Sequence, residues 1–340
     1  SLVLVAGFLV LSQSMFKMNG HVGNFTALTI TLALVFDLLL LPCVLLFPHD
    51  IRRVFAKFKP SSNAFVVSED QVPASQTNPV KEIVEACLKQ NGYGLSLHFQ
   101  KIIALDKEQE GDSFEVLARI RDAERKLIFP RSFLPIAQNL GMMNKFDRQV
   151  IVQTLDWVQL SKSQANGQAK PQEKQLKLCS FNLSLDSVLD KGLPDFIVAE
   201  IDERALNAES FCFEMEANYI SKYGSAVAQF IFSMQQRGLK IALSKVKTNG
   251  SQCFKYINYL AIHYLKIDGR KLVNLDQKSK KWKQLETLFR HARLSQVEII
   301  VENVENKQLI SSLNKLGAHY GQGMGIAVPF DMKTALAAGV

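Results

Sequence analysis

Polar side chains that can bind a metal ion or move a proton recur at or near the ends of short apolar runs. The residues concerned are Glu115, Asn182, Glu214, Ser244, Lys266, Asp268, Glu302 and Gln322. Carboxylate and amide oxygens of this kind are the ligands that magnesium and manganese prefer. Each residue alone is typical of a solvated strand end, but their recurrence at successive ends favours one shared polar site.

The runs that carry these residues alternate with helix-like stretches along the chain. Strand-like runs lie at 95–105, 176–185, 211–217, 239–244, 263–268, 297–303 and 318–325, and helix-like stretches include 132–160, 225–238 and 280–294. Helix-length connections imply parallel strands with right-handed crossovers. Seven or eight such units predict an α/β fold, a closed (β/α)8 barrel of the TIM type, in which strand ends converge on one mouth. The alternative is an open doubly wound sheet, although no glycine-rich phosphate motif follows the first strand.

The first 48 residues have the composition of membrane segments. Phe25–Phe47 is an apolar run of 23 residues with one charge, Asp37, which is long enough to cross a bilayer core of about 30 Å. The apolar stretch 1–16 is shorter, and we interpret it as the end of a truncated helix. The two stretches predict a transmembrane helical hairpin over residues 1–48.

A basic segment and a linker follow the predicted hairpin. Residues 49–80 begin with a segment that carries Arg52, Arg53, Lys57 and Lys59 against Asp50. The positive-inside rule therefore places the rest of the chain in the cytoplasm. The stretch 60–80 is rich in proline and small polar residues, as linkers are. The soluble domain is expected at 81–340.

The segment from Gly7 to Leu46 resembles the last two helices of exporters of the resistance-nodulation-division superfamily. The resemblance rests on the pattern S…F…G…TALTI…D-LLLLP within residues 1–48. It implies a multi-pass protein of the bacterial inner membrane with the barrel in the cytoplasm. It also leaves open that the barrel is a regulatory tail of such an exporter.

The soluble part resembles the EAL domain, the barrel that binds and hydrolyses cyclic di-GMP. "FQKII", "FEVLAR", "FNLS", "FEMEA", "LKID", "VENVE" and "LGAHYGQGMGIAVP" follow the family's motifs in order, over about residues 88–335. The resemblance implies ligand contacts at Gln100, Leu117, Arg119, Asp147, Asp268 and Gln322. It also implies vestigial catalytic roles for Glu302 and Lys266. For Arg119, a structural salt bridge with a strand-end carboxylate is the alternative to binding a phosphate.

The metal site implied by the resemblance is incomplete. Glu115, Asn182 and Glu214 match the family's ligands, but Ser244 and Lys245 replace its two adjacent aspartates. A divalent cation loses two anionic ligands and meets a positive charge there. We expect the Lys245 ammonium to occupy the metal position and to pair with Glu115 or Glu214. The alternative is that Lys245 points to solvent.

These departures indicate a membrane-tethered, catalytically degenerate EAL domain that acts as a cyclic di-GMP receptor or as a signalling and interaction module. The alternative is an active phosphodiesterase with a rearranged metal site, which would open cyclic di-GMP to linear pGpG. No cofactor is expected for the first function, and magnesium or manganese only for the second. The expected partners are cyclic di-GMP, the lipid bilayer and a possible second copy of the barrel. No nucleic acid is expected, since the lysines around Trp282 are interpreted as a solvated helix start.

Overall fold

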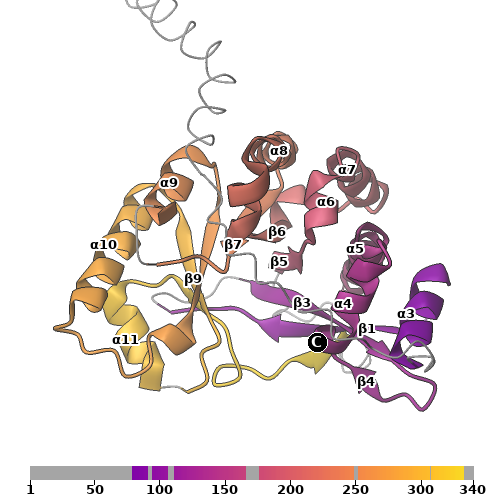
Figure 1. Cartoon of the computed structure of the whole chain (residues 1–340), viewed down its shortest axis with the longest axis horizontal. Coiled ribbons are helices and arrows are strands. Elements are labelled where there is room, and N and C mark those ends of the chain that lie inside the picture. Colours follow the sequence, from indigo (N-terminus) through magenta and orange to yellow (C-terminus); the bar gives the residue numbers. More distant parts are fainter. Residues whose placement is uncertain are drawn as a thin grey trace, which may run out of the picture. The chain divides into compact units, whose positions relative to one another are not determined.

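The computed structural model describes residues 79–90, 94–105, 111–165, 176–248, 252–306 and 308–332 (Figure 1). The predicted membrane hairpin at 1–48 and the basic segment after it lie outside these residues. Within the described ranges, no helix is both long and apolar enough to cross a membrane.

The strands form a closed barrel. They are β1 (Leu95–Lys101), β2 (Ile103–Ala104), β3 (Asp112–Arg121), β4 (Leu127–Ile128), β5 (Leu176–Asn182), β6 (Phe211–Glu216), β7 (Lys240–Ser244), β8 (Tyr264–Asp268), β9 (Glu298–Glu302), β10 (Tyr320–Gly321) and β11 (Phe330–Asp331). The hydrogen-bonded order runs β1-β3-β5-β6-β7-β8-β9-β10-β2. Only Ile102 separates β1 from β2, so the first and last members of this path are one bent strand and the ring is closed. The open-sheet alternative is therefore wrong.

Helices surround the ring on its outer side (Figure 1). They are α3 (Pro79–Lys89), α4 (Pro130–Asn139), α5 (Met143–Ala165), α6 (Leu185–Leu189), α7 (Leu193–Glu203), α8 (Ala217–Gln235), α9 (Gln252–Tyr259), α10 (Lys280–Leu294) and α11 (Gln308–Leu316), with short 3₁₀ turns η1 (Ala208–Ser210) and η2 (Gly269–Lys271). The sequence dictates their boundaries locally. In α10, the Ser279 side chain accepts a hydrogen bond from the backbone N–H of Trp282, as an N-cap should. Trp282 is only 3% exposed, so its lysine neighbours form a solvated face around a buried anchor.

One strand of the ring, the bent strand β1–β2, runs against the others; β4, which pairs with β3 outside the ring, is also antiparallel to its neighbour. Neighbouring strands from β3 to β10 are parallel, whereas β1 is antiparallel to β3 and β2 is antiparallel to β10. The connection from β1 to β3, residues 102–111, is too short for a helical crossover, so the chain makes a hairpin there. The expected parallel βα pattern therefore begins only at β3.

An apolar layer fills the barrel interior. Its members are Ile102, Leu178, Cys212, Ala242, Tyr264, Ile300 and Tyr320, all buried. Each comes from a different strand position around the ring, as expected for inward side chains of a closed barrel. This layer forms the floor of the polar site.

Candidate functional site

The polar site lies one step along the strands from the apolar layer. Because side chains on one face of a strand alternate with a period of two, the next inward residues are Ser180, Glu214, Ser244, Lys266, Glu302 and Gln322. On β1, which runs the other way, the equivalent residue is Gln100. Glu115 of β3 lies in register with both Gln100 and Ser180. These residues line the mouth, the end of the barrel at which the parallel strands finish.

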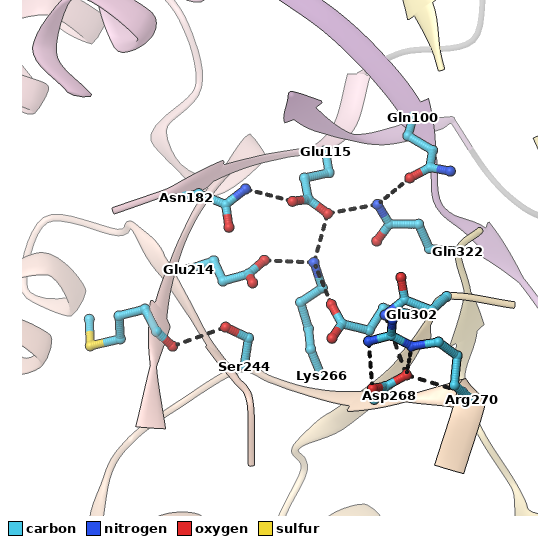
Figure 2. Close-up of polar contacts among 12 residues, drawn as sticks. Gln100, Glu115, Asn182, Glu214, Ser244, Lys266, Asp268, Arg270, Glu302 and Gln322 are labelled. Carbon is cyan, nitrogen blue, oxygen red and sulfur yellow. Dashed lines mark hydrogen bonds and ion pairs between the residues drawn. The ribbon is translucent and has the colours of Figure 1, made fainter. Parts of the chain in front are cut away.

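Lys266 is the centre of this polar layer (Figure 2). Its side chain is 1% exposed, and Nζ lies 2.7 Å from Glu115 Oε2, 2.6 Å from Glu214 Oε2 and 3.7 Å from Glu302 Oε2. An ammonium with three N–H donors can satisfy carboxylates from several directions. A single buried cation thus holds three strands of the mouth together.

Glu115 has additional hydrogen-bond donors. Asn182 Nδ2 donates to its Oε1 at 2.6 Å, and Gln322 Nε2 donates to its Oε2 at 2.6 Å. The same Gln322 amide also donates to Gln100 Oε1 at 3.2 Å, while its own oxygen is buried without a hydrogen-bond partner. The site therefore offers one unsatisfied acceptor, the Gln322 carbonyl oxygen, at the mouth.

The three carboxylates differ in their pKa values. Burial alone would raise the pKa of Glu115, but Lys266, Asn182 and Gln322 together lower it. Glu214 lacks the two amide donors, and burial raises its pKa to about 7 despite Lys266. Burial likewise raises the pKa of Glu302.

The charges around Lys266 also act on the lysine. Burial alone would lower the pKa of Lys266, but Glu115, Glu214 and Glu302 outweigh it and raise that pKa. The mouth therefore holds a permanent cation beside an ionised Glu115 and a Glu214 that can take up a proton near neutral pH.

Lys245 does not occupy the position between the glutamates, so that expectation is wrong. Its side chain is 67% exposed and forms an ion pair with Glu216. The reason is the strand alternation. Ser244 faces inward and is buried, so the next residue leaves the interior, and its backbone has a φ of +53°. The cation between the carboxylates is Lys266.

Ser244 contributes little to the polar network. Its hydroxyl donates to the Met215 carbonyl at 3.5 Å. Among the described residues, no group of three His, Cys, Asp or Glu side chains is arranged to hold a metal ion. The donor set at the mouth, with Lys266 between Glu115 and Glu214, does not fit the oxygen cage that magnesium or manganese requires.

A cavity of about 600 Å³ opens beside the polar layer. Among its lining residues are three cations, Arg119, Lys222 and Lys245, and the predicted site residues Leu117, Asp147, Asn182, Glu214 and Ser244. Arg119 lies over the ring of Phe129, with its Cζ 5.0 Å from the ring centroid. No carboxylate among the described residues forms an ion pair with Arg119, so the structural salt-bridge alternative is not supported.

Asp147 and Asp268 are already engaged within the protein. Asp147 Oδ2 accepts from the backbone N–H of Ser184 at 2.8 Å and from its hydroxyl at 2.6 Å, and burial raises the pKa of Asp147 to about 6. Asp268 is bound by the Arg270 guanidinium at 2.9 Å. Hydrogen bonding to Arg270 lowers the pKa of Asp268. Asp147 lines the cavity, whereas Asp268 lies at the mouth beside Glu302 (Figure 2).

Four contributors to the site were not predicted. Phe129 supports Arg119, Ser184 binds Asp147, and Tyr219 and Lys222 of α8 line the cavity. Tyr219 and Lys222 are three residues apart, a spacing that places both on one helix face. That spacing is the only signal in the sequence, and it does not say which face meets the barrel mouth.

The barrel and its mouth define the class of protein. A closed ring that brings Glu115 of β3, Asn182 of β5 and Lys266 of β8 to one mouth carries the site residues that the motifs predicted, although its antiparallel first strand was not expected. The EAL domain family matches residues 59–329. The chain belongs to the EAL domain family.

Two curated relatives are named as cyclic di-GMP phosphodiesterases. PdeB of Shewanella oneidensis is 25% identical over 281 residues, which cover 82% of this chain and 32% of PdeB. PdeF of Escherichia coli is 27% identical over 221 residues, which cover 64% of this chain and 28% of PdeF. The chain thus spans about a third of the length of these relatives.

Solved EAL domains share the fold. The FimX EAL domain of Pseudomonas aeruginosa, bound to c-di-GMP, aligns with a TM-score of 0.64 and 23% identity over 74% of this chain and 96% of the solved domain. The S helix-GGDEF-EAL part of LapD from Vibrio cholerae, also bound to c-di-GMP, aligns with a TM-score of 0.58 and 16% identity over 75% and 58% of the two chains.

Proposed function

We propose that this EAL domain binds cyclic di-GMP without hydrolysing it and so acts as a receptor or interaction module for that nucleotide. The observation that carries the proposal is that Ser244 and Lys245 supply no carboxylate to the mouth, where Glu115 and Glu214 are bound to the Lys266 ammonium. Ser244 and Lys245 stand where the EAL motif has two aspartates, so neither position supplies a carboxylate that would compete with the ammonium.

The charge at this position opposes hydrolysis. A phosphodiesterase of this kind needs a divalent metal to activate water and to neutralise the phosphate. Here a permanent cation takes up the carboxylates that would hold it, and a like charge repels a metal ion. Without an activated water, Glu302 can contact a bound ligand but has no nucleophile to direct.

The binding part of the proposal rests on the cavity and the mouth. Arg119 presents a guanidinium to the cavity without an ion pair to a described carboxylate, and a planar fork of this kind suits a phosphodiester. Gln322 offers a buried, unsatisfied acceptor. FimX and LapD, which share the fold, were solved with c-di-GMP.

An active phosphodiesterase is the second candidate. One observation favours it: Glu115, Asn182, Glu214, Lys266 and Glu302 all converge on the mouth, and the curated relatives PdeB and PdeF are named as cyclic di-GMP phosphodiesterases. It would require Lys266 to withdraw from the carboxylates when magnesium or manganese enters.

The test separates binding from turnover. Calorimetry of the full chain with cyclic di-GMP, in EDTA and in magnesium, should give binding in both buffers. Chromatography for linear pGpG in magnesium or manganese should find none. Arg119→Gln should weaken binding about tenfold, equivalent to the roughly 1.4 kcal/mol of a charge-assisted contact. Arg125→Gln, an exposed arginine away from the cavity, is the matched control. Turnover that disappears in Glu115→Ala would establish the second candidate.

Membrane attachment completes the proposal. The apolar run Phe25–Phe47 and the basic segment after it would tether the barrel to the cytoplasmic face of a bacterial inner membrane. A second copy of the barrel is a further proposed partner. A role as a regulatory tail of an exporter would place the same barrel in the same compartment.

A further inference from the structure

The rim of the cavity carries a lysine whose present partner is weakly held. Lys245 follows β7 directly, lines the cavity and pairs with Glu216, the last residue of β6. Glu216 and Ser244 are in register, which brings the lysine to the glutamate. Glu216 also accepts from Asn218 Nδ2 at 2.9 Å, so the carboxylate is oriented from its own chain.

We propose that Lys245 contacts the ligand directly: its ammonium binds a phosphodiester oxygen of the nucleotide in the cavity, and Glu216 holds the ammonium in place until the ligand enters. This inference rests on the proposed function, because it names how that same site recognises the ligand. It assigns the phosphate contact to an exposed side chain rather than to the buried Lys266.

Because Lys245 is exposed, its ammonium can exchange Glu216 for a ligand phosphate at little cost in free energy. An ion pair with a largely solvated member contributes little to stability. The Lys245 side chain is 67% exposed, and that of Glu216 is 26% exposed. The ammonium has two further N–H donors after it bonds Glu216. Lys266 cannot make the same exchange, since it is buried and bound by Glu115 and Glu214 at 2.7 and 2.6 Å.

The backbone places Lys245 at the rim. A φ of +53° is uncommon for a residue other than glycine and is conformationally unfavourable. The conformation turns the side chain from the outer wall of the barrel to the cavity, where Arg119 stands on the β3 side and Lys222 on the α8 side.

The acidic residues of the cavity determine how readily the Lys245 ammonium can bind a ligand phosphate. Asp147 is bound to Ser184, and Glu214 is bound to Lys266. The exposed Asp186 also lines the cavity, but Glu216 is the carboxylate that pairs with Lys245 and so competes directly with a ligand for it. Removing the lysine leaves Glu216 to repel a phosphate, whereas removing the charge of Glu216 frees the lysine. The two substitutions must therefore act in opposite directions.

The experiment is calorimetry of the full chain with cyclic di-GMP in EDTA and in magnesium, for the parent chain and four variants. We expect equal affinity in the two buffers within about twofold. Lys245→Gln should weaken binding about 5–10-fold and Glu216→Gln should tighten it about 2–5-fold, the size of one exposed charge contact. Lys245→Arg should restore most of the affinity. Lys247→Gln, an exposed lysine outside the cavity lining, should change nothing.

The outcomes separate this inference from the proposed function. Absence of binding by the parent chain in both buffers overturns the proposed function itself. Binding that requires magnesium, or a loss of affinity in both Lys245→Gln and Glu216→Gln, leaves a receptor but overturns the role of Lys245. Melting curves of each variant, equal to that of the parent within a few degrees, show that the affinity changes do not arise from unfolding.

Discussion

Replacing Lys266 with methionine should destabilise the barrel strongly. Methionine is also a long unbranched side chain with an apolar stem, but it has no charge. The carboxylates of Glu115, Glu214 and Glu302 therefore lose the cation that they share. Glu115 and Glu214 are both buried, and Nζ lies 2.7 and 2.6 Å from them. A buried charge without its partner costs far more than an exposed one, because water cannot replace the lost contact.

The magnitude depends on pH. Removing one member of a buried ion pair costs about 3–5 kcal/mol when the remaining charge stays ionised, which we expect at pH 8. At pH 5 both glutamates can accept a proton at a cost of under about 1 kcal/mol each, since their usual pKa is near that pH. The expected loss there is about 1–2 kcal/mol. For a domain of this size, the loss at pH 8 corresponds to a fall in melting temperature of about 10 °C.

Urea unfolding followed by tryptophan fluorescence and far-UV circular dichroism measures this difference at both pH values. Lys245→Met is the matched control: the same substitution, at an exposed lysine with an exposed ion pair, should cost no more than about 1 kcal/mol at either pH. The double variant Lys266→Met with Glu214→Gln should recover part of the loss, because one of the stranded charges is gone.

Three results would contradict the predicted role of Lys266. The first is a cost below about 1 kcal/mol for Lys266→Met at pH 8, which would mean that water or another group solvates the carboxylates. The second is an equal cost for Lys245→Met, which would return the central role to the exposed lysine. The third is a loss that does not change between pH 5 and pH 8.

Three further predictions follow from the same structure. The pKa of Glu214 is raised from 4.5 to about 7, so between these pH values the folded chain holds a proton that the unfolded chain has released. The free energy of unfolding should therefore fall as pH rises from about 4.5 to about 7. In urea titrations at a series of pH values, Glu214→Gln should remove about 3 kcal/mol of that fall. Asp147→Ala should cost about 1–2 kcal/mol, measured by urea unfolding, since Ser184 at the start of α6 loses its acceptor; an unchanged midpoint would contradict this role. Protease added outside intact cells should leave residues 81–340 uncut if Phe25–Phe47 spans the membrane as predicted, and cleavage of the barrel would reverse the topology.

The strands and the polar layer could be predicted because they depend on local patterns. Seven residues of the polar layer lie two positions from a residue of the barrel floor, as Glu214 does from Cys212 and Lys266 does from Tyr264. Apolar runs of strand length, separated by helix-length stretches, therefore indicate both the barrel and the residues at its mouth. The motifs also identified the family, since they occur in order along the chain.

Closure of the ring depended on tertiary structure. It rests on the pairing of Ile103 with Gly321, residues more than two hundred positions apart, and on a reversed first strand that puts Gln100 before Ile102 instead of after it. No local sequence preference determines that register. It is set when β10, the last strand of the ring, pairs with β2 and closes the barrel.

The identity of the central cation was also decided by tertiary structure. Lys245 and Lys266 both lie near strand ends, and charge alone could not choose between them. The inward direction of Ser244 excludes its neighbour Lys245 from the interior, while Lys266 shares the inward face of β8 with Tyr264. An ammonium becomes the partner of buried carboxylates only where the pleat of the strand points it at them, and that direction is fixed when the barrel closes.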